Sequence, residues 1–400
     1  MEAALILFLV MYVLLLAIPK WRAYIAMACA AAFVILGILP VGHLFIESKM
    51  PARLADMLIG KVPNMKWAII VLAFFAGLIS AFVDNVATVL IVVPVALNIS
   101  RKLGVSPVYS IIAIAISSNL QGAATLVGDT TSILLGGHAN MNFMDFFVYK
   151  GKPGLFWVVQ ISAIAATAIL LVVFRKETNK IHIEDKTPVS DYFPTILLLG
   201  VVVALIVASF IPHNIVNING YICMAFLLVG VVRTWIRAKD KVPVVTLAKE
   251  IDYFTLLLLA GLFIVIAGIA EAGVIDAVSR LFVDIGGNSL FAIYTLLVWA
   301  SVLFSAFIDN IPYIAAMLPV VTGIASLMNV DPTILYFGLL SGATLGGNLT
   351  PIGASANITA LGILRKQGYE VKTSTFMKIS VPFTLTAVGI GYGLIWLIWR

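Results

Sequence analysis

The 400-residue sequence predicts an all-α, multi-pass membrane protein, built as an inverted structural repeat with two re-entrant hairpins and two broken transmembrane helices. Composition, charge distribution and an internal duplication predict this fold class. Hydrophobic residues make up 62% of the chain and charged residues 11%, whereas a soluble domain is roughly half apolar and a quarter charged. The charges gather in short stretches between long apolar runs. Soluble enzymes and nucleic-acid-binding proteins are therefore excluded.

Several apolar runs approach the roughly 20 residues that a helix needs to cross a bilayer. These runs cover residues 3–18, 24–39, 155–174, 193–211, 221–235, 253–269 and 379–399. The first run has no basic leader and no cleavage site, so we expect it to be a retained span rather than a signal peptide. The hydrophilic stretch 175–191 is expected to be a cytoplasmic linker between a first half, residues 1–174, and a second half, residues 192–400.

A duplicated segment indicates how the two halves are related. Residues 80–85 read S-A-F-V-D-N and residues 305–310 read S-A-F-I-D-N, an offset of 225 (from 80 to 305). The same offset aligns helix-breaking residues, namely Pro94 with Pro319, Pro107 with Pro332, Gly122 with Gly347, Thr125 with Thr350 and Gly128 with Gly353. An odd number of crossings separates the copies, so the second should be inverted. The Lys- and Arg-rich loops then lie mostly on one side, expected to be cytoplasmic.

The first copy contains one span fewer than the second. Residues 24–39 would align with 221–235 at an offset near 196, and the difference of roughly 29 residues corresponds to one span with its turn. The discontinuity lies near residues 42–43. Either this copy has lost a helix, or a stretch is absent from the sequence. We favour the second explanation, because deletion of one span would invert everything upstream.

Each half contains two places where polar residues interrupt apolar sequence. The Asp-Asn pairs at Asp84 and Asp309 lie between apolar stretches of roughly 15 residues, which predicts re-entrant hairpins with tips at 84–88 and 309–313. The other interruptions read N-L-Q-G-A-A-T-L-V-G-D-T-T-S (119–132) and G-G-N-L-T-P-I-G-A-S-A-N (346–357), and predict broken helices over residues 107–135 and 332–364. Unwound backbone at membrane depth exposes carbonyl groups and helix N-termini that bind ions.

Three intramembrane aspartates, Asp84, Asp129 and Asp309, would each cost about 2.5–3.5 kcal/mol at a helix centre. An aspartate can simply cap a half-helix, but two equivalent Asp-Asn pairs favour an ion site, and one residue can do both. Oxygen ligands suit Na⁺ or H⁺ better than soft metals. The predicted ion-binding residues, with Na⁺ as the hypothetical metal at the two Asp-Asn pairs, are Asp84, Asn85, Thr88, Gly122, Thr125, Asp309, Asn310, Gly347 and Thr350.

Asp129 has no acidic counterpart in the second half, where Ala354 occupies its place, so we predict that it exchanges protons. The residues expected to bind the transported species are Asn119, Thr130, Thr131, Ser132, Asn348, Ser355 and Asn357. These loops contain no Arg or Lys, so an anionic cargo would depend on helix dipoles and bound cations. No cofactor is expected besides the coupling ion, and no nucleic-acid partner.

These motifs resemble the ion transporter superfamily with the citrate-transporter-like domain, and within it the arsenite-permease/NhaD-type antiporter branch. The resemblance covers most of the chain from Glu47 and implies an elevator-type transporter, usually homodimeric. The dicarboxylate branch has Ser-Asn-Thr at the hairpin tips, where this chain has Asp-Asn. Many antiporter relatives carry G-D-P-P-N where this chain reads G-D-T-T-S (128–132), whereas D-T-T-S and T-P-I-G (350–353) are more similar to arsenite permeases.

The sequence therefore predicts a secondary active transporter in the cytoplasmic membrane of a prokaryote, coupled to Na⁺ or H⁺, and not an enzyme. Three functions stay open. Na⁺/H⁺ antiport, or another small-ion transport coupled to Na⁺ or H⁺, is favoured by the carboxylates and the lack of basic residues. Arsenite or antimonite efflux is the second, and Na⁺-coupled transport of an organic or inorganic anion such as a dicarboxylate or citrate is the third. The paired hairpins argue against a passive channel.

Overall fold

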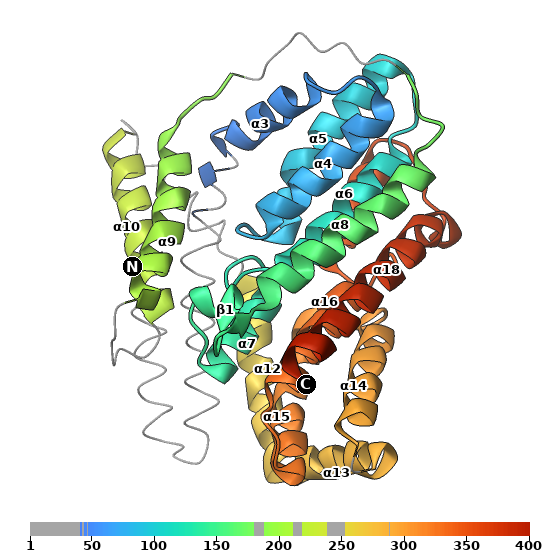
Figure 1. The fold of residues 1–400 in the computed structure, drawn as a ribbon. Helices are drawn as coiled ribbons and strands as arrows, with labels where there is room; N and C mark the ends of the chain where they lie inside the picture. The colour runs from blue at the N-terminus through green and yellow to red at the C-terminus, as the bar shows by residue number, and fades with distance from the viewer. Residues whose placement is uncertain are drawn as a thin grey trace.

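The computed structural model describes residues 41, 44–45, 47–179, 188–210, 218–237, 253–287 and 289–400, and these are mostly helical (Figure 1). The helices of the first half are α3 (Met50–Ile59), α4 (Met65–Ser80), α5 (Asn85–Leu103), α6 (Val108–Gly122), α7 (Thr130–Ala139) and α8 (Leu155–Val173). Those of the second half are α9 (Phe193–Phe210), α10 (Ile218–Arg237), α12 (Tyr253–Glu271), α13 (Val274–Gly286), α14 (Leu290–Ser305), α15 (Asn310–Met328), α16 (Thr333–Gly346), α17 (Ser355–Lys366) and α18 (Thr373–Trp399). A short 3-10 turn, η2 (Met144–Phe146), and two strands, β1 (Val148–Tyr149) and β2 (Lys152–Pro153), lie between α7 and α8.

Four helices in the described part of the chain are long and apolar enough to cross a membrane, namely α8, α9, α15 and α18. The pair α13 and α14 would make a fifth span if counted as one, although the two helices meet at 119°. The runs predicted at 155–174, 193–211, 221–235, 253–269 and 379–399 all lie in helices, and α18 begins six residues earlier than expected. The predicted spans 3–18 and 24–39, the discontinuity at 42–43 and residues 180–187 of the linker lie outside the described residues.

The two hairpins differ from the prediction in the position of their tips and in the length of one arm. α4 ends at Ser80 and α5 begins at Asn85, so the first connection is residues 81–84 and not 84–88. The second is residues 306–309 and not 309–313. In each case the helix starts directly after an aspartate because that carboxylate caps it. The arm before each tip has 16 residues, but the arm after it has 19, and α15 is long enough to span.

Both broken helices are interrupted where Gly and Pro predicted it. α6 ends at Gly122 and α7 begins at Thr130, while α16 ends at Gly346 and α17 begins at Ser355. Their outer ends extend beyond the predicted limits of 135 and 364, to Ala139 and Lys366. Each break therefore leaves eight or fewer residues of non-helical backbone in the middle of the segment, between residues 122 and 130 or 346 and 355.

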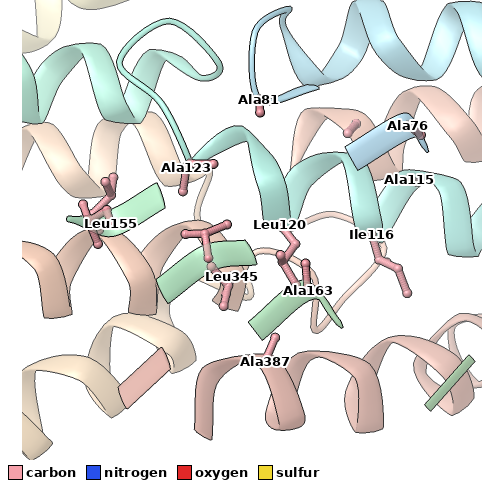
Figure 2. Close-up of a cluster of buried hydrophobic side chains, with 14 of the residues drawn as sticks. Ala76, Ala81, Ala115, Ile116, Leu120, Ala123, Leu155, Ala163, Leu345 and Ala387 are labelled. Atoms are coloured by element: carbon pink, nitrogen blue, oxygen red, sulfur yellow. The ribbon is translucent and has the colours of Figure 1, made fainter. Parts of the chain in front are cut away.

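The first arms of these broken helices, α6 and α16, form the centre of the protein. Every residue of α6 from Ser110 to Gly122 and every residue of α16 is buried. α6 packs on α4, and α16 packs on α14 and α18, which in turn packs on α8. Alanines contribute much of this core, including Ala76, Ala81, Ala115, Ala123, Ala163 and Ala387 (Figure 2). Small side chains let helices approach closely, as membrane proteins require.

The periphery is different in character. α9 and α10 pair with each other at one side of the molecule (Figure 1). The outer face of α9 exposes Ile196, Leu199, Val203, Val207 and Phe210. Most of α9 is not buried inside the protein, so this surface fits contact with lipid. α13 crosses the lower end of α14 and α15 (Figure 1).

Candidate functional site

All three aspartates that the sequence predicts to lie within the membrane are at helix N-termini. Asp84 Oδ2 accepts a hydrogen bond from the Ala87 N–H at 3.0 Å, and Asp309 Oδ1 accepts one from Ile311 N–H at 3.1 Å. Asp129 Oδ1 accepts a longer one from Thr131 N–H at 3.4 Å. Each carboxylate thus satisfies an amide that the first helical turn leaves free, and interacts favourably with the helix dipole.

The capping role does not use every carboxylate oxygen. The Ser355 hydroxyl donates to Asp309 Oδ2 at 3.0 Å. Asp129 Oδ2, by contrast, is buried and has no hydrogen-bond partner in the described part of the chain. Buried acceptors without a partner are rare because leaving one costs free energy. Asp129 is therefore the aspartate with an oxygen left over for a ligand.

Each helix break packs onto the hairpin tip of its own half through the same contacts. Thr125 Oγ1 donates to the carbonyl oxygen of Ala81, and Thr350 Oγ1 donates to that of Ala306. A Cβ atom on Gly128 would lie 2.7 Å from the carbonyl oxygens of Ser80 and Ala81, and one on Gly353 would lie 2.8 Å from those of Ser305 and Ala306. Glycine is required at both positions because the backbones touch. The sequence repeat is thus also a repeat of contacts.

Two asparagines join the two broken helices. Asn119 Nδ2 donates to the Thr344 carbonyl at 2.9 Å and to Asn348 Oδ1 at 3.1 Å, and Asn348 Nδ2 donates to the Ile116 carbonyl at 2.8 Å. Asn85 Nδ2 donates to Asn119 Oδ1 at 3.0 Å, so the first hairpin tip belongs to the same network. Both Asn119 and Asn348 are completely buried. These predicted cargo-binding residues use their amides to hold the protein together.

The carboxylates of both halves gather around this junction. Asp129 interacts electrostatically with Asp84 from its own half and with Asp309 from the other half. The hydroxyl oxygens of Thr131 and Thr344 lie 3.2 Å apart and also join the two halves. The fold therefore brings together three acidic side chains that are far apart in the sequence. Each pair of negative charges repels, so a bound cation or proton would stabilise the arrangement.

Other predicted site residues divide into two groups. Asn357 Nδ2 donates to the carbonyl oxygens of Gly347 and Thr350, both at 3.2 Å, and so closes the second break. The polar atoms that are buried and lack a hydrogen-bond partner within the described ranges include Thr88 Oγ1, Ser132 Oγ, Asn310 Nδ2 and Asn357 Oδ1. Thr130 is buried beside Asp129, and Gly122 and Gly347 lie against Asp129 and Gly353. The polar atoms that lack a described partner are the ones that could contact a ligand.

Sequence reasoning missed four polar residues in this region, of which Gln121 has the largest side chain. Gln121 is 1% exposed, and its Oε1 has no hydrogen-bond partner among the residues that the structure describes. The hydroxyls of Ser80, Ser117 and Ser305 are in the same condition. A glutamine directly before a helix break was a signal present in the sequence. Its burial could not be read there because it depends on α4.

The described residues do not form a metal centre with several strong ligands. No group of three or more His, Cys, Asp or Glu side chains that could hold a metal lies in the described residues. The available ligands are single carboxylates with amide, hydroxyl and carbonyl oxygens. Such a mixed set suits a weakly held hard cation better than a transition metal.

Several apolar helices around two interrupted central helices, with a buried aspartate where they meet, are the architecture of a multi-pass membrane transporter. The chain belongs to the CitMHS citrate transporter family, whose sequence profile matches residues 1–342 and 249–400. It is 32% identical over 337 residues to an uncharacterised transporter of Mycobacterium tuberculosis, which covers 82% of this chain and 76% of that protein. It is 26% identical over 406 residues to the P protein of Homo sapiens, covering 81% of this chain and 48% of that protein.

Two solved structures share the fold. The YdaH transporter of Alcanivorax borkumensis superposes with a TM-score of 0.65 at 17% identity, over 96% of this chain and 88% of that one. MtrF of Neisseria gonorrhoeae, described as one of a class of antimetabolite efflux pumps, superposes with a TM-score of 0.62 at 15% identity, over 96% of this chain and 83% of that one. The predicted relationship to citrate transporters is confirmed, while the arsenite-permease/NhaD branch stays a prediction.

Proposed function

We propose that this protein is a secondary active transporter that couples the movement of its cargo to Na⁺ or H⁺ at the junction of α6–α7 with α16–α17. One observation supports the proposal most directly. Oδ2 of Asp129 is buried and has no hydrogen-bond partner among the described residues. The side chain also lies within electrostatic range of Asp84 and Asp309. A buried negative charge needs neutralisation, and a proton or a Na⁺ ion supplies it.

Competition for one carboxylate group explains how exchange would work. A proton on Asp129 and a Na⁺ ion beside it neutralise the same charge, so binding of one disfavours binding of the other. If the loaded site is alternately exposed to the two sides of the membrane, the protein exchanges Na⁺ for H⁺. We therefore place Na⁺/H⁺ antiport, or transport of a small ion coupled to Na⁺ or H⁺, first.

Transport of a citrate-like anion with Na⁺ is the second candidate. Asn310 Nδ2 is a buried donor that has no partner in the described part of the chain, and it lies in the first turn of α15. A helix N-terminus with a free N–H donor favours an anionic oxygen. Membership of the citrate transporter family supports this cargo as well. Arsenite or antimonite efflux rests only on the D-T-T-S and T-P-I-G fragments and is third.

The proposed movement is of the elevator type. The two hairpins and the two broken helices would move as one body. Asn119 and Asn348 join the broken helices to each other, and Asn85 joins the first hairpin tip to them. The second tip is bound to its own break through Thr350 and Ser355. α9 packs mainly on α10 and would belong to the stationary part. The equivalent contacts at Thr125 and Thr350 support two copies with one design, which we propose to be inverted relative to each other. We expect a homodimer in the cytoplasmic membrane of a prokaryote.

Purified protein in liposomes tests the coupling. A Na⁺ gradient is imposed on vesicles that contain a pH-sensitive dye, and labelled citrate uptake is measured in parallel. We expect the wild type to respond to the Na⁺ gradient in at least one of these two measurements, and Asp129→Asn to lose that response. Asp284→Asn, which removes an exposed carboxylate from α13, is the matched control and should keep it. Full coupled activity in Asp129→Asn would contradict the proposal.

A further inference from the structure

Gln121 is the last residue but one of α6, and its burial has no explanation within the contacts described above. Its side chain is 1% exposed, and Oε1 has no hydrogen-bond partner among the described residues. An amide in that state is costly, and an apolar side chain of similar size would avoid the cost. A bound ligand would satisfy the buried amide oxygen, by hydrogen bonding or by coordination, and so explain why the residue is a glutamine.

The position of Gln121 is set by a glycine on the facing helix. A Cβ atom on Gly77 of α4 would lie 2.1 Å from Gln121 Nε2 and 2.9 Å from the carbonyl oxygen of Ser117. The amide of Gln121 therefore lies directly over Gly77. α4 could carry no larger residue there without displacing the amide.

The second half solves the same packing problem without a polar group. At the offset of 225, Gln121 corresponds to Gly346 and Gly77 corresponds to Val302. A Cβ atom on Gly346 would lie 2.6 Å from Cα of Val302, so the glycine is now on the broken helix. One glycine at this crossing is enough for close packing. Packing therefore does not explain why the first half admits a glutamine.

Other oxygen atoms without partners lie at the same crossing. A Cβ atom on Gly122, the next residue, would lie 3.2 Å from Cβ and 3.7 Å from Oδ2 of Asp129. Ser117 lies one turn before Gln121 on α6, and Ser80 lies one turn after Gly77 on α4. Their hydroxyls, like Oε1 of Gln121 and Oδ2 of Asp129, are buried and have no partner in the described ranges. One carboxylate and several neutral oxygens thus belong to adjoining turns where α4, α6 and the first break meet.

The second half lacks most of these ligands. Gly346, Gly342 and Ala354 stand where the first half has Gln121, Ser117 and Asp129. Only Ser305 remains, as the counterpart of Ser80. The acidic residue that the second half does have, Asp309, already binds the Ser355 hydroxyl.

We propose that Gln121 is a ligand of a monovalent-cation site that exists only in the first half. Asp129 supplies the negative charge, and Gln121 with the hydroxyls of Ser80 and Ser117 supplies neutral oxygens. A single carboxylate among neutral oxygens suits Na⁺ better than Ca²⁺ or Mg²⁺, which bind sites with more negative charge. This proposal rests on the proposed coupling to a cation and adds to it the location of the ion and the residue that selects it.

The test measures Na⁺ binding by purified protein in detergent. Thermal unfolding midpoints are recorded as NaCl replaces choline chloride at constant ionic strength, and the half-saturating Na⁺ concentration is read from the rise in midpoint. Gln121→Leu should raise this concentration about tenfold or more, while its midpoint without Na⁺ stays the same or increases because an unsatisfied amide is gone. Gln160→Leu, at a glutamine of α8 whose Nε2 is also buried without a described partner, should leave the Na⁺ response unchanged.

Two further variants cover the case in which Gln121→Leu fails to fold. Gly77→Ala places a methyl group on the amide of Gln121 and should weaken Na⁺ binding in the same direction. Gln121→Glu keeps an oxygen at the position and should retain Na⁺ binding, with a stronger dependence on pH.

The outcomes separate this proposal from the proposed function. If the wild type responds to Na⁺ and both Gln121→Leu and Gly77→Ala respond within about twofold of it, Gln121 is not a ligand and only this inference is overturned. A lower midpoint in Gln121→Leu with unchanged Na⁺ affinity would likewise show a purely structural residue. If the wild type shows no stabilisation by Na⁺ that protons oppose, the Na⁺ site is refuted, and only coupling to H⁺ is left for the proposed function.

Discussion

The first and second halves of the protein have the same contacts between backbone elements but different polar side chains at their centres. In both halves a threonine and a glycine hold the helix break against the hairpin tip. Two oxygen atoms without a partner in the described ranges belong to residues that differ between the halves, because Asp129 corresponds to Ala354 and Gln121 to Gly346. The two copies thus share the contacts that their backbones need and differ in several of the polar side chains beside them. Among the described residues, the second half has its own unpartnered polar atoms, such as the Ser305 hydroxyl, Asn357 Oδ1 and the amide donor of Asn310, but no carboxylate oxygen is among them.

Moving the carboxylate from one half to the other should have the largest effect. The double variant Asp129→Ala, Ala354→Asp keeps the number of acidic groups but places the charge beside Gly347 instead of Gly122. Gly346 supplies no amide there, so we expect coupled transport to fall by about 100-fold or more. Liposome flux measures the effect, and the single variant Ala354→Asp is the control for the added charge. Restored transport in the double variant would show that the halves are interchangeable.

Substitution of the two break glycines should affect both halves equally. Gly128→Ala and Gly353→Ala would each force a methyl group to within 2.6–2.8 Å of carbonyl oxygens, which we expect to cost about 1–3 kcal/mol of stability. Thermal unfolding in detergent measures the loss. Gly137→Ala on α7, where a Cβ atom meets nothing within 4 Å, is the control and should be neutral or slightly stabilising. A large difference between the two break variants would contradict the shared design.

The protein should lose more stability when Asn119 of the junction is truncated than when Thr344 is. Asn119→Ala removes bonds to the Thr344 carbonyl, Asn348 and Asn85, and should cost about 1–3 kcal/mol because those buried groups lose their partner. Thr344→Ala removes one hydroxyl and its contact with the Thr131 hydroxyl but keeps the carbonyl that Asn119 binds, and should cost less. Comparison of the two unfolding midpoints tests this order. Equal losses would mean that the asparagine network does not hold the halves together.

A small effect is expected at the surface, where the turn between β1 and β2 contacts the start of α16. Lys150 donates to Asp331 and to the Thr333 hydroxyl. The hydrogen bond to Asp331 raises the pKa of Lys150 above its ordinary value. Partial burial acts to raise the pKa of Asp331, but hydrogen bonds from Lys150 and Thr333 outweigh it and hold that pKa below its ordinary value.

Both shifts make the contact stabilising at neutral pH. The contribution of Asp331 is present above its unfolded pKa and is lost as pH falls through its lower folded value. That of Lys150 is present below its unfolded pKa and is lost as pH rises through its higher folded value. Both side chains are about half exposed, so Lys150→Met should cost at most about 1 kcal/mol at pH 7, and less in high salt. An undiminished loss at pH 3 would show that the contact is not ionic.

The order of elements followed from local sequence. Gly122, Gly128, Gly347 and Gly353 predicted both helix breaks, because glycine is unfavourable inside a helix and each break has two of them a few residues apart. The aspartates predicted the hairpin connections to within a few residues, since a capping carboxylate marks a helix start. The length of α15 was not predicted, because the pattern around Pro319 does not show whether a helix continues through it.

The candidate site could be predicted only as a set of residue types. The amino-acid sequence alone determined the class of membrane protein, the repeated segment and the family. The length of an apolar run, the positions of helix-breaking residues and the residues of a motif are all local properties of the chain. Tertiary structure decided which polar atoms are already satisfied, as for Asn119 and Asn348, which meet across 229 residues. It also decided which are left without a partner, as for Gln121 over Gly77. Whether a buried oxygen is free for an ion depends on what the facing helix supplies, and no single segment contains that information.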